Sequence, residues 1–257
     1  MKITALVENT SDCGLPAEHG LSLFVETNGI RFLFDMGQTN LFARNAEALG
    51  IDLDTADFAV LSHGHYDHGG GLKTFLSLNS HAPVYLSRYA FEPHYNGTEK
   101  YIGLDPELQE SGRLVFIDSE KTIAEGISLH NCPDAPKIMD FGSSGLNMVR
   151  DGRLLPEDFR HEHYLLAEEN GKRILFSGCS HRGILNIMHW FRPDILIGGF
   201  HMSKLPLDDI LAGYARELNT YPAVCYTCHC TGTAQYRFMQ DHMDRLHYLG
   251  TGDCIEI

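Results

Sequence analysis

Short apolar runs bounded by turn residues set the pattern at the start of the chain. Residues 3–7 form an apolar run that predicts a first strand. Residues 21–26 and 31–34 alternate apolar and polar side chains on either side of the pair Asn28-Gly29. Asn-Gly is a favoured two-residue turn, so these segments predict a β-hairpin.

The pattern then changes from strand to helix and back. A helix is expected from about residue 41 to residue 50, with Asn40 as its cap. Residues 58–61 form a short, continuous apolar run, which is typical of a buried strand. A further helix and a further strand are expected at 72–78 and 82–86.

The second half of the chain repeats this pattern. When the sequence is compared with itself at an offset of 142 residues, the first hairpin matches a later segment without a gap. The matched pairs are His19 and His161, Leu23 and Leu165, Glu26 and Glu168, Asn28 and Asn170, Gly29 and Gly171, Arg31 and Arg173, Leu33 and Leu175, and Phe34 and Phe176. The repeat predicts a second hairpin, and the same order of elements continues at 183–191, 193–201, 206–218 and 223–227.

The repeat predicts two similar β-rich halves that face each other across a pseudo-twofold axis. We expect one α/β domain over residues 1–257, because no change of composition and no linker divides the chain. Residues 91–113 and 133–160 have no counterpart and are polar and weakly periodic. We expect irregular binding loops there that set substrate specificity, with surface decoration as the alternative.

The segment from Ser62 to Gly71 carries the densest chemistry of the sequence. Four potential metal ligands fall within six positions, directly after the apolar run at 58–61: His63, His65, Asp67 and His68. Imidazole and carboxylate are usual ligands of zinc, iron and manganese, so this strand end predicts a metal site. Alternate positions on an extended turn point apart, which favours two ions, one on the first two histidines and one on Asp67 and His68.

Other strand ends offer side chains that would complete such a site. His181 follows the second hairpin, and His229 follows the strand expected at 223–227. We expect both to be metal ligands. His201 follows another expected strand, and its role as ligand or structural residue stays open. Cys179 is either a thiolate ligand, a bridge between ions, or a buried free cysteine.

Two alternatives remain for the cysteine-rich stretch around His229. The segment from Cys225 to His229 fits the attachment pattern of c-type haem. A structural zinc site could use Cys225, Cys228, His229 and Cys230. Both are disfavoured, because the cysteines lie on an expected core strand and no second cysteine pair has the spacing of a zinc finger.

Composition narrows the class of protein and the kind of partner. Hydrophobic residues make up 43% and charged residues 21% of the 257 positions, as in an ordinary soluble protein, and no apolar run is long enough for a membrane span. Seven cysteines, an odd number, and a start unlike a secretory signal indicate reduced thiols and the cytoplasm. A net charge of −14 disfavours nucleic acid, so we expect a small-molecule substrate and no membrane partner. The oligomeric state stays open.

The motif at residues 63–68 resembles the HxHxDH signature of the metallo-β-lactamase-like hydrolase superfamily. Asp35 resembles the earlier aspartate of that family, and the duplicated halves resemble its αββα four-layer sandwich. Five further motifs are similar to one branch, the dihydropterin ribofuranosylaminobenzene phosphate synthases and related metal-dependent hydrolases. They lie at residues 18–22, 33–38, 177–184, 198–201 and 229–232.

The resemblance implies roles for particular residues. It implies that His229 is the last metal histidine and that Asp35 orients the metal-binding loop. Cys179 stands where the family has a bridging aspartate, and the family's Gly-His-Thr turn is only faintly matched around His130. We take His181 as the substitute ligand, with His130 and His163 as the next candidates.

These residues predict a metal-dependent hydrolase or transferase that acts on an ester, a phosphoester or a pterin diphosphate. One or two divalent ions are expected, zinc first, with manganese or iron as alternatives, on His63, His65, Asp67, His68, His181 and His229. Such an ion yields hydroxide near neutral pH and stabilises an oxyanion. Asp67 is the candidate general base if only one site is filled, and His201 is the candidate substrate contact. The alternatives are an iron-dependent oxidoreductase and a non-catalytic metal or ligand sensor.

Overall fold

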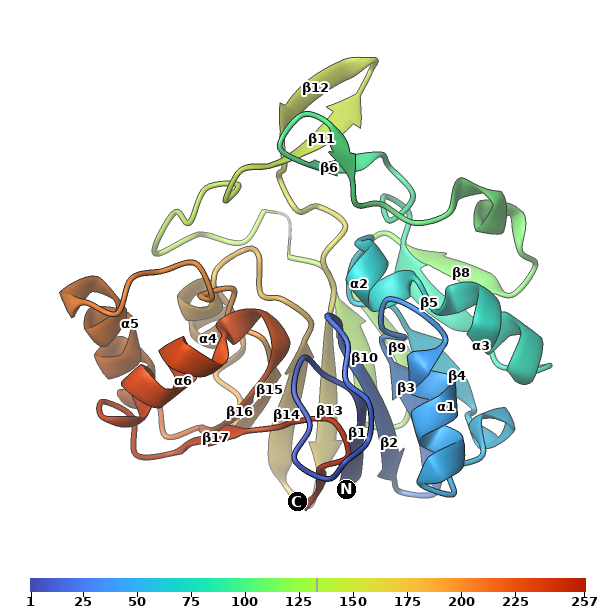
Figure 1. Ribbon diagram of the computed structural model, residues 1–257, viewed down its shortest axis with the longest axis horizontal. Coiled ribbons are helices and arrows are strands. Elements are labelled where there is room, and N and C mark those ends of the chain that lie inside the picture. Colours follow the sequence, from blue (N-terminus) through green and yellow to red (C-terminus); the bar gives the residue numbers. More distant parts are fainter. Residues whose placement is uncertain (133) are drawn as a thin grey trace.

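Two seven-stranded sheets face each other in the centre of the computed structural model, which describes residues 1–132 and 134–257 (Figure 1). Pro133, at the start of the unmatched segment 133–160, lies outside the described residues. In spatial order the first sheet consists of β18 (Cys254–Glu256), β1 (Lys2–Val7), β2 (Ser22–Thr27), β3 (Ile30–Phe34), β4 (Phe58–Val60), β5 (Val84–Ser87) and β8 (Leu114–Ile117).

The second sheet has the same plan and contains the second copy of the repeat. Its strands in spatial order are β17 (Leu246–Tyr248), β16 (Val224–Thr227), β15 (Ile195–Gly198), β14 (Lys172–Ser177), β13 (Tyr164–Glu169), β10 (Ile127–His130) and β9 (Lys121–Ala124). In both sheets an antiparallel hairpin is followed by parallel strands, β3-β4-β5 in one and β14-β15-β16 in the other.

Strand register confirms the internal repeat. Leu23 pairs with Phe34 in the first hairpin, and Leu165 pairs with Phe176 in the second. The Asn-Gly pair fixes this register, because both of its residues have the positive φ angles that a tight hairpin turn requires. The two halves of the chain are therefore equivalent in structure as well as in sequence.

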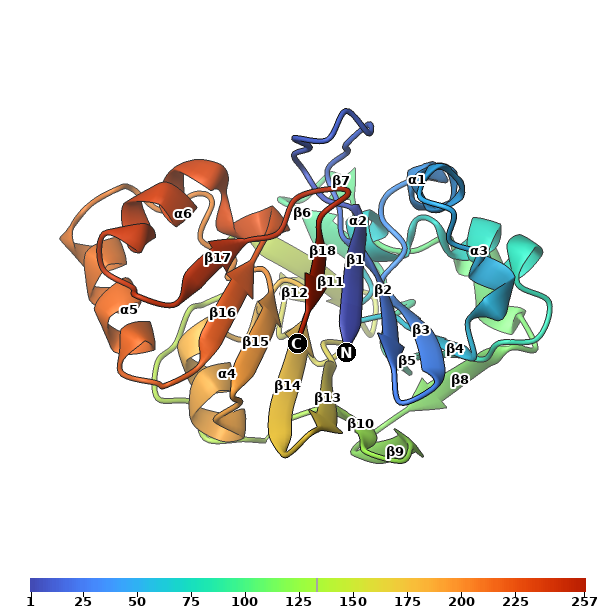
Figure 2. The same ribbon diagram turned by 90° about the horizontal axis from the view of Figure 1, so that it is seen from below.

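Helices cover the outer face of each sheet (Figure 2). Helices α1 (Leu41–Ala48) and α3 (Leu72–Leu78) lie on the first sheet, and α4 (Ile184–Phe191), α5 (Asp209–Asn219) and α6 (Thr233–Gln240) lie on the second. The result is the expected αββα four-layer sandwich. Asn40 precedes α1, but its side chain makes no capping hydrogen bond; the Thr39 hydroxyl accepts from the Leu41 N–H instead, at 3.1 Å.

Three short 3-10 helices lie within the described residues. They are η1 (Leu53–Thr55), η2 (Pro106–Glu110) and η3 (His229–Thr231). Within the described part of the chain, no helix has both the length and the apolar character needed to cross a membrane.

Apolar side chains from both sheets form one shared central layer. Phe32 and Phe34 point into this layer, whereas Leu33 between them packs against the helices outside. Phe176 enters the layer from the second sheet, with its ring 5.9 Å from that of Phe32. Strands buried on both faces explain why the sequence shows continuous apolar runs instead of strict alternation.

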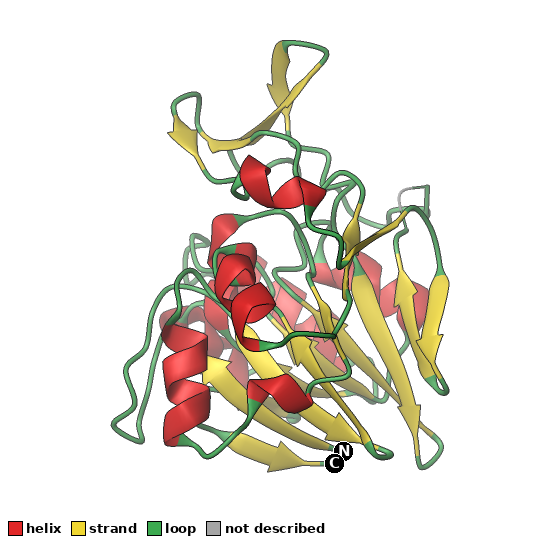
Figure 3. Ribbon diagram, turned by 90° about the vertical axis from the view of Figure 1, so that its right-hand side faces the viewer, coloured by secondary structure: helices red, strands yellow, loops and turns green. Residues whose placement is uncertain are grey.

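A small third sheet stands above the sandwich and corrects one expectation. It consists of β12 (Arg153–Pro156), β11 (Leu146–Arg150), β6 (His94–Asn96) and β7 (Lys100–Tyr101), and we call it the cap sheet (Figure 3). Segments 91–113 and 133–160 supply all four strands, so the expectation of irregular loops was wrong. The strands are too short for their period to show, and β11 pairs with β6 only across a long stretch of sequence.

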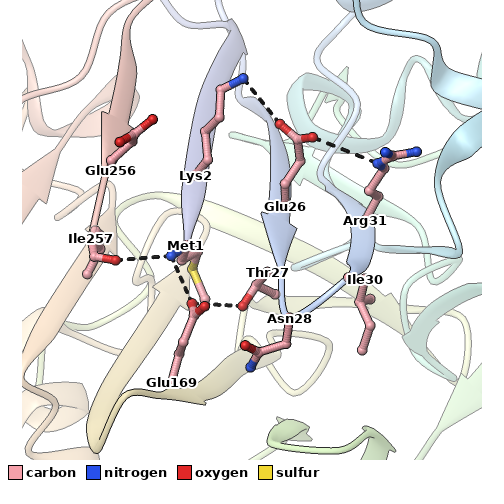
Figure 4. Close-up of a pocket in the computed structure, with 11 residues that line it drawn as sticks. Met1, Lys2, Glu26, Thr27, Asn28, Ile30, Arg31, Glu169, Glu256 and Ile257 are labelled. Atoms are coloured by element: carbon pink, nitrogen blue, oxygen red, sulfur yellow. Dashed lines mark hydrogen bonds and ion pairs between the residues drawn. The ribbon is translucent and has the colours of Figure 1, made fainter.

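A surface pocket of about 440 Å³ lies at the opposite end of the sandwich, where both termini meet (Figure 4). Several of its charged groups already pair with one another. The Met1 amino group lies 3.0 Å from Glu169, and Lys2 lies 3.3 Å from Glu26. We therefore assign no chemistry to this pocket and turn to the other end of the strands.

Candidate metal centre

The loop after β4 begins the site and turns into a short helix. Helix α2 (Tyr66–Gly69) starts inside the histidine motif, so the motif is not the extended turn that the sequence suggested. The helical turn brings His68 next to His63, although the two were expected to bind different ions. The ring centroid of His63 lies 4.1 Å from that of His68 and 4.6 Å from that of His65.

Asp35, at the end of β3, holds this loop through buried hydrogen bonds. Its Oδ1 accepts from the Ser62 backbone N–H at 2.7 Å, and its Oδ2 accepts from the Ser62 hydroxyl at 2.7 Å. The Ser62 oxygen lies 2.8 Å from Nδ1 of His63. Because the hydroxyl proton goes to Asp35, Ser62 must accept from His63, which leaves the lone pair of His63 on Nε2. The expected contact between Asp35 and the metal-binding loop is confirmed.

His68 and His229 are oriented in the same manner from opposite halves. Nδ1 of His68 lies 2.7 Å from Oδ2 of Asp35, and Nδ1 of His229 lies 2.8 Å from the side-chain oxygen of Asn9. Each ring therefore carries a proton on Nδ1 and presents Nε2 to the centre. The two Nε2 atoms lie 3.2 Å apart, a separation suited to two ligands of one ion.

Cys179, after β14, lies between two groups of potential ligands. One ligand atom from each of His63, Cys179 and His181 lies within 4.8 Å of the others, and the same holds for His68, Cys179 and His229. Its Sγ is 3.2 Å from Nε2 of His68. Burial raises the pKa of the Cys179 thiol well above its usual value, and the neighbouring Cys230 adds to the effect. The thiolate form of Cys179 would need a nearby cation to be stable at this buried position.

His181 lies beside the motif histidines, as expected. Its ring centroid is 4.9 Å from those of both His63 and His65, and the ring stacks on Phe159 at 4.6 Å. Both ring nitrogens are buried without a hydrogen-bond partner. Burial and the charges of His201 and His65 lower the pKa of His181 well below its usual value, so the ring is neutral and able to bind a metal.

Asp67 faces the pocket next to histidines of both halves. Its Oδ2 lies 3.1 Å from Nε2 of His19 and 3.4 Å from Nε2 of His229. Burial disfavours the carboxylate, but the neighbouring His19 and His229 side chains keep the pKa of Asp67 well below its usual value. The side chain is therefore ionised. His19, an exposed residue to which the sequence analysis gave no role in the site, belongs to this group.

His201, after β15, lies close to His181, with 4.3 Å between the ring centroids. It also forms a group of potential ligands with Cys179 and Cys230. His201 and His229 both have positive φ angles, as do Asp35 and Ser180. Such backbone strain in residues other than glycine is often found at functional sites, and here it recurs at four strand ends that surround one centre.

Two buried glutamates that the sequence analysis missed support the backbone of the site. Oε1 of Glu8 accepts from the His229 N–H at 2.6 Å, and Oε1 of Glu162 accepts from the His181 N–H at 2.7 Å. Both carboxylates are almost fully buried. Glu8 directly follows β1, so the rule that polar residues after core strands carry function would have found it.

His130 and His163, the next candidates after His181 for the substitute ligand, lie in different surroundings. Nε2 of His130 lies 2.8 Å from the Ser128 hydroxyl, and its ring packs on Phe191. His163 is buried and donates its backbone N–H to the Ser62 carbonyl. The structure thus brings His181 to the motif histidines by a direct ring contact, which it does not show for His130.

The cysteines proposed for haem or a structural zinc do not share a site. Cys225 packs in the apolar layer between the second sheet and its helices, whereas Cys228 packs in the central layer between the sheets. The two thiols therefore lie on opposite faces of the sheet, and both alternatives are wrong.

A cavity of about 230 Å³ opens onto the centre beneath the cap sheet. Asp67, His181, His201 and His229 line its base. The cap side contributes Asn96, Lys100, Ile102 and Leu146, and Lys204 comes from the second half. The two unmatched segments thus form part of the wall of the cavity, as a specificity role requires.

The donor set fits a divalent transition metal. Nε2 of His63 and both ring nitrogens of His181 are buried and have no hydrogen-bond partner. Unpartnered polar atoms in a protein interior are unfavourable, and a bound cation would satisfy the acceptor nitrogen of each ring. Imidazole, carboxylate and thiolate donors suit zinc, iron or manganese, and they do not select among these metals.

Comparison with known proteins gives this fold and site a family. Residues 15–209 match the metallo-beta-lactamase superfamily, and the chain belongs to that superfamily. The chain is 30% identical to an uncharacterised protein of Methanocaldococcus jannaschii, and the aligned region covers 90% of each of the two chains. It is 29% identical to a 7,8-dihydropterin-6-methyl-4-(beta-D-ribofuranosyl)-aminobenzene-5'-phosphate synthase of the same organism, over 100% of this chain and 96% of the other.

Solved structures agree with this assignment. One described as a metal-dependent hydrolase of the beta-lactamase superfamily superposes with a TM-score of 0.86 at 29% identity, over 100% of this chain and 99% of that chain. A metallo-beta-lactamase fold protein from Bacillus subtilis gives a TM-score of 0.62 at 14% identity, over 100% and 98%, which shows the shared fold alone.

Proposed function

We propose that the chain is a metal-dependent hydrolase, or a transferase of the same mechanism, that acts on a small phosphate-bearing ester or diphosphate. The observation that carries this proposal is the set of imidazoles whose Nδ1 atoms are engaged by Ser62, Asp35 and Asn9. Their Nε2 atoms are thereby prepared for a cation. His63, His65 and His181 would hold one ion, and Asp67, His68 and His229 a second, with Cys179 between them.

A bound divalent ion supplies hydroxide near neutral pH and stabilises the charge that develops on the substrate. The side chains of this protein do the rest. With only the first ion bound, Asp67 would be placed to hold a proton at Oδ2 or to pass it to His19, 3.1 Å away. His201 lines the same cavity and would contact the substrate. Zinc is the first expectation for both positions, and a cytoplasmic location agrees with the seven free thiols.

Two lysines at the cavity support an anionic substrate. Lys100 and Lys204 are exposed and line the cavity from the cap sheet and from the second half. In a chain with a net charge of −14, paired cations at the mouth of one cavity would attract a phosphate. The name of the phosphate synthase relative is consistent with such a substrate. Hydrolysis and condensation at the phosphate remain two outcomes of one proposal.

A substrate panel on metal-loaded protein tests the reaction. The panel holds an aryl phosphodiester, a diphosphate, a neutral aryl ester and a lactone, assayed with zinc, manganese or iron. Replacing Asp67 and His68 together by Ala should abolish turnover, whereas replacing the exposed His81 by Ala should not change it. Full activity in the double variant would overturn the proposal, and metal-dependent oxygen consumption without hydrolysis would favour the oxidoreductase.

The choice of substrate class has a separate test. Lys100→Ala and Lys204→Ala should raise KM for the phosphodiester by about tenfold each and leave KM for the neutral ester unchanged, because each removes one charge from the cavity mouth. Lys73→Ala, on α3 away from the cavity, is the matched control. Equal effects on both substrates would contradict an anionic substrate.

A further inference from the structure

A second group of buried titratable side chains lies behind the metal centre. One ligand atom from each of His65, His94, Glu157 and His161 lies within 4.8 Å of the other three. All four side chains are buried. His94 begins strand β6 and Glu157 directly follows β12, so both come from the cap sheet and its connections. The cap sheet thus reaches a proposed metal ligand, His65, through charged and polar groups.

Hydrogen bonds decide whether this group is itself a metal site. Nδ1 of His161 accepts from the Gly64 backbone N–H at 2.7 Å, so the neutral ring carries its proton on Nε2. That Nε2 lies 3.5 Å from Oε1 of Glu157. Nδ1 of His94 lies 2.7 Å from Oε2 of Glu157 and donates to it. Both rings therefore direct N–H groups at the carboxylate, and neither directs a lone pair at a shared ion.

His65 belongs to the same group and shows the same need for an acceptor. Nε2 of His65 is buried and has no hydrogen-bond partner, and the same is true of Oε1 of Glu157. An N–H on Nε2 would be stabilised by this carboxylate, whereas a lone pair there would face negative charge. A neutral imidazole with its proton on Nε2 has its lone pair on Nδ1.

We infer that Glu157 is a positioning residue that fixes His65 with its proton on Nε2 and makes Nδ1 the nitrogen available to the metal centre. This inference rests on the proposed function, because His65 is a ligand only if the centre binds a metal. It gives the cap sheet a second role besides lining the cavity. The position of the cap sheet and the affinity for the metal are then coupled, and the coupling acts in both directions.

Apolar contacts make this coupling direct. Ile102, Leu146 and Phe159 form a small cluster of their own with Tyr66 of α2 packed against it. The Tyr66 N–H donates to the Ile102 carbonyl at 2.9 Å. Movement of the cap sheet would therefore shift Glu157 and the first turn of α2 together.

The first experiment reads the tautomer of His65 in the metal-free protein by nitrogen NMR of labelled histidine, with His65→Ala to assign the signal. The expected result is a proton on Nε2. A proton on Nδ1 would overturn the inference. This measurement needs neither metal nor substrate, so its outcome is independent of whether the proposed function holds.

The second experiment compares metal affinity by competition with a chelator. Glu157→Leu should weaken metal binding about 10- to 100-fold. Glu157→Gln keeps an acceptor, so its metal affinity should lie between that of Glu157→Leu and that of the wild type. Asp158→Leu, on the exposed neighbour, should bind as the wild type does. Wild-type affinity in both Glu157 variants would overturn the inference, as would an ion found between Glu157 and His161 in a metal-loaded crystal. If Glu157→Leu does not fold, the metal affinity of Glu157→Gln and the tautomer of His65 test the inference.

Discussion

His68 and Asp35 form a fully buried pair, with Nδ1 of the imidazole 2.7 Å from Oδ2 of the carboxylate. Burial disfavours a charged ring, but the negative charge of Asp35 and its hydrogen bond raise the pKa of His68 to about 9. Without metal the ring is therefore protonated at neutral pH. Binding of an ion at Nε2 would release that proton, so the pair links metal binding to proton release.

Asp35→Asn should weaken metal binding about 10- to 100-fold, because the amide cannot hold both Ser62 and His68 as the carboxylate does. The measurement is competition with a chelator at fixed pH. Asp12→Asn, a change of the same kind at an exposed position, should leave the affinity as it is. Unchanged affinity in Asp35→Asn would show that Asp35 only fills space.

His181→Ala should remove one ion from the protein. The ring lies beside His63 and His65, and both of its nitrogens lack a partner. Elemental analysis of untagged wild type and variant, purified in parallel, gives the stoichiometry. His130→Ala should keep all the metal, since its ring bonds Ser128 instead. The opposite pattern would make His130 the ligand and exclude His181.

Gly178→Ala should unfold the site and destabilise the protein. An added Cβ would lie 2.2 Å from the Ser62 hydroxyl, the group that orients His63. The cost of such overpacking is about 1–3 kcal/mol. Gly213→Ala on α5 meets nothing within 4 Å and should be neutral or stabilise by about 0.5–1 kcal/mol. Urea unfolding of both variants checks the contrast, and equal stability would refute the clash.

Acid should destabilise the metal-free protein partly through His163. Burial, with a smaller effect of His130, lowers the pKa of His163 to about 4. The unfolded chain binds this proton below pH 6.5 and the folded chain does so only near pH 4, so stability is lost as pH falls through that window.

The difference in unfolding free energy between wild type and His163→Leu isolates the contribution of His163 protonation to stability. It should change by about 3 kcal/mol between pH 7 and pH 4, with the Leu variant relatively more stable in acid. A difference that stays constant with pH would mean that His163 is protonated equally in both states.

Local sequence patterns determined most of the sandwich. The Asn-Gly turns fixed the register of both hairpins, and the offset of 142 residues predicted two equivalent halves before any contact was known. The metal motif, His181 and His229 were also found from one rule, that polar side chains after core strands meet at one edge of a sheet. That rule works because parallel strands place their carboxyl ends together.

The cap sheet could not be predicted in this way. Its strands have two to five residues, and β6 pairs with β11 across roughly fifty residues of sequence. Periodicity needs a longer window, so the segments resembled loops. The helical turn at Tyr66 was missed for the same reason, since four residues carry too little pattern to define a helix.

The sequence by itself determined which residue types could bind a metal and on which strand ends they stand. Only the tertiary structure decided which ring nitrogen is free, because the partners that hold the other nitrogen are distant in sequence: Asp35 for His68 and Asn9 for His229. Proton placement depends on hydrogen bonds and burial, and these arise only when the two halves and the cap sheet pack together.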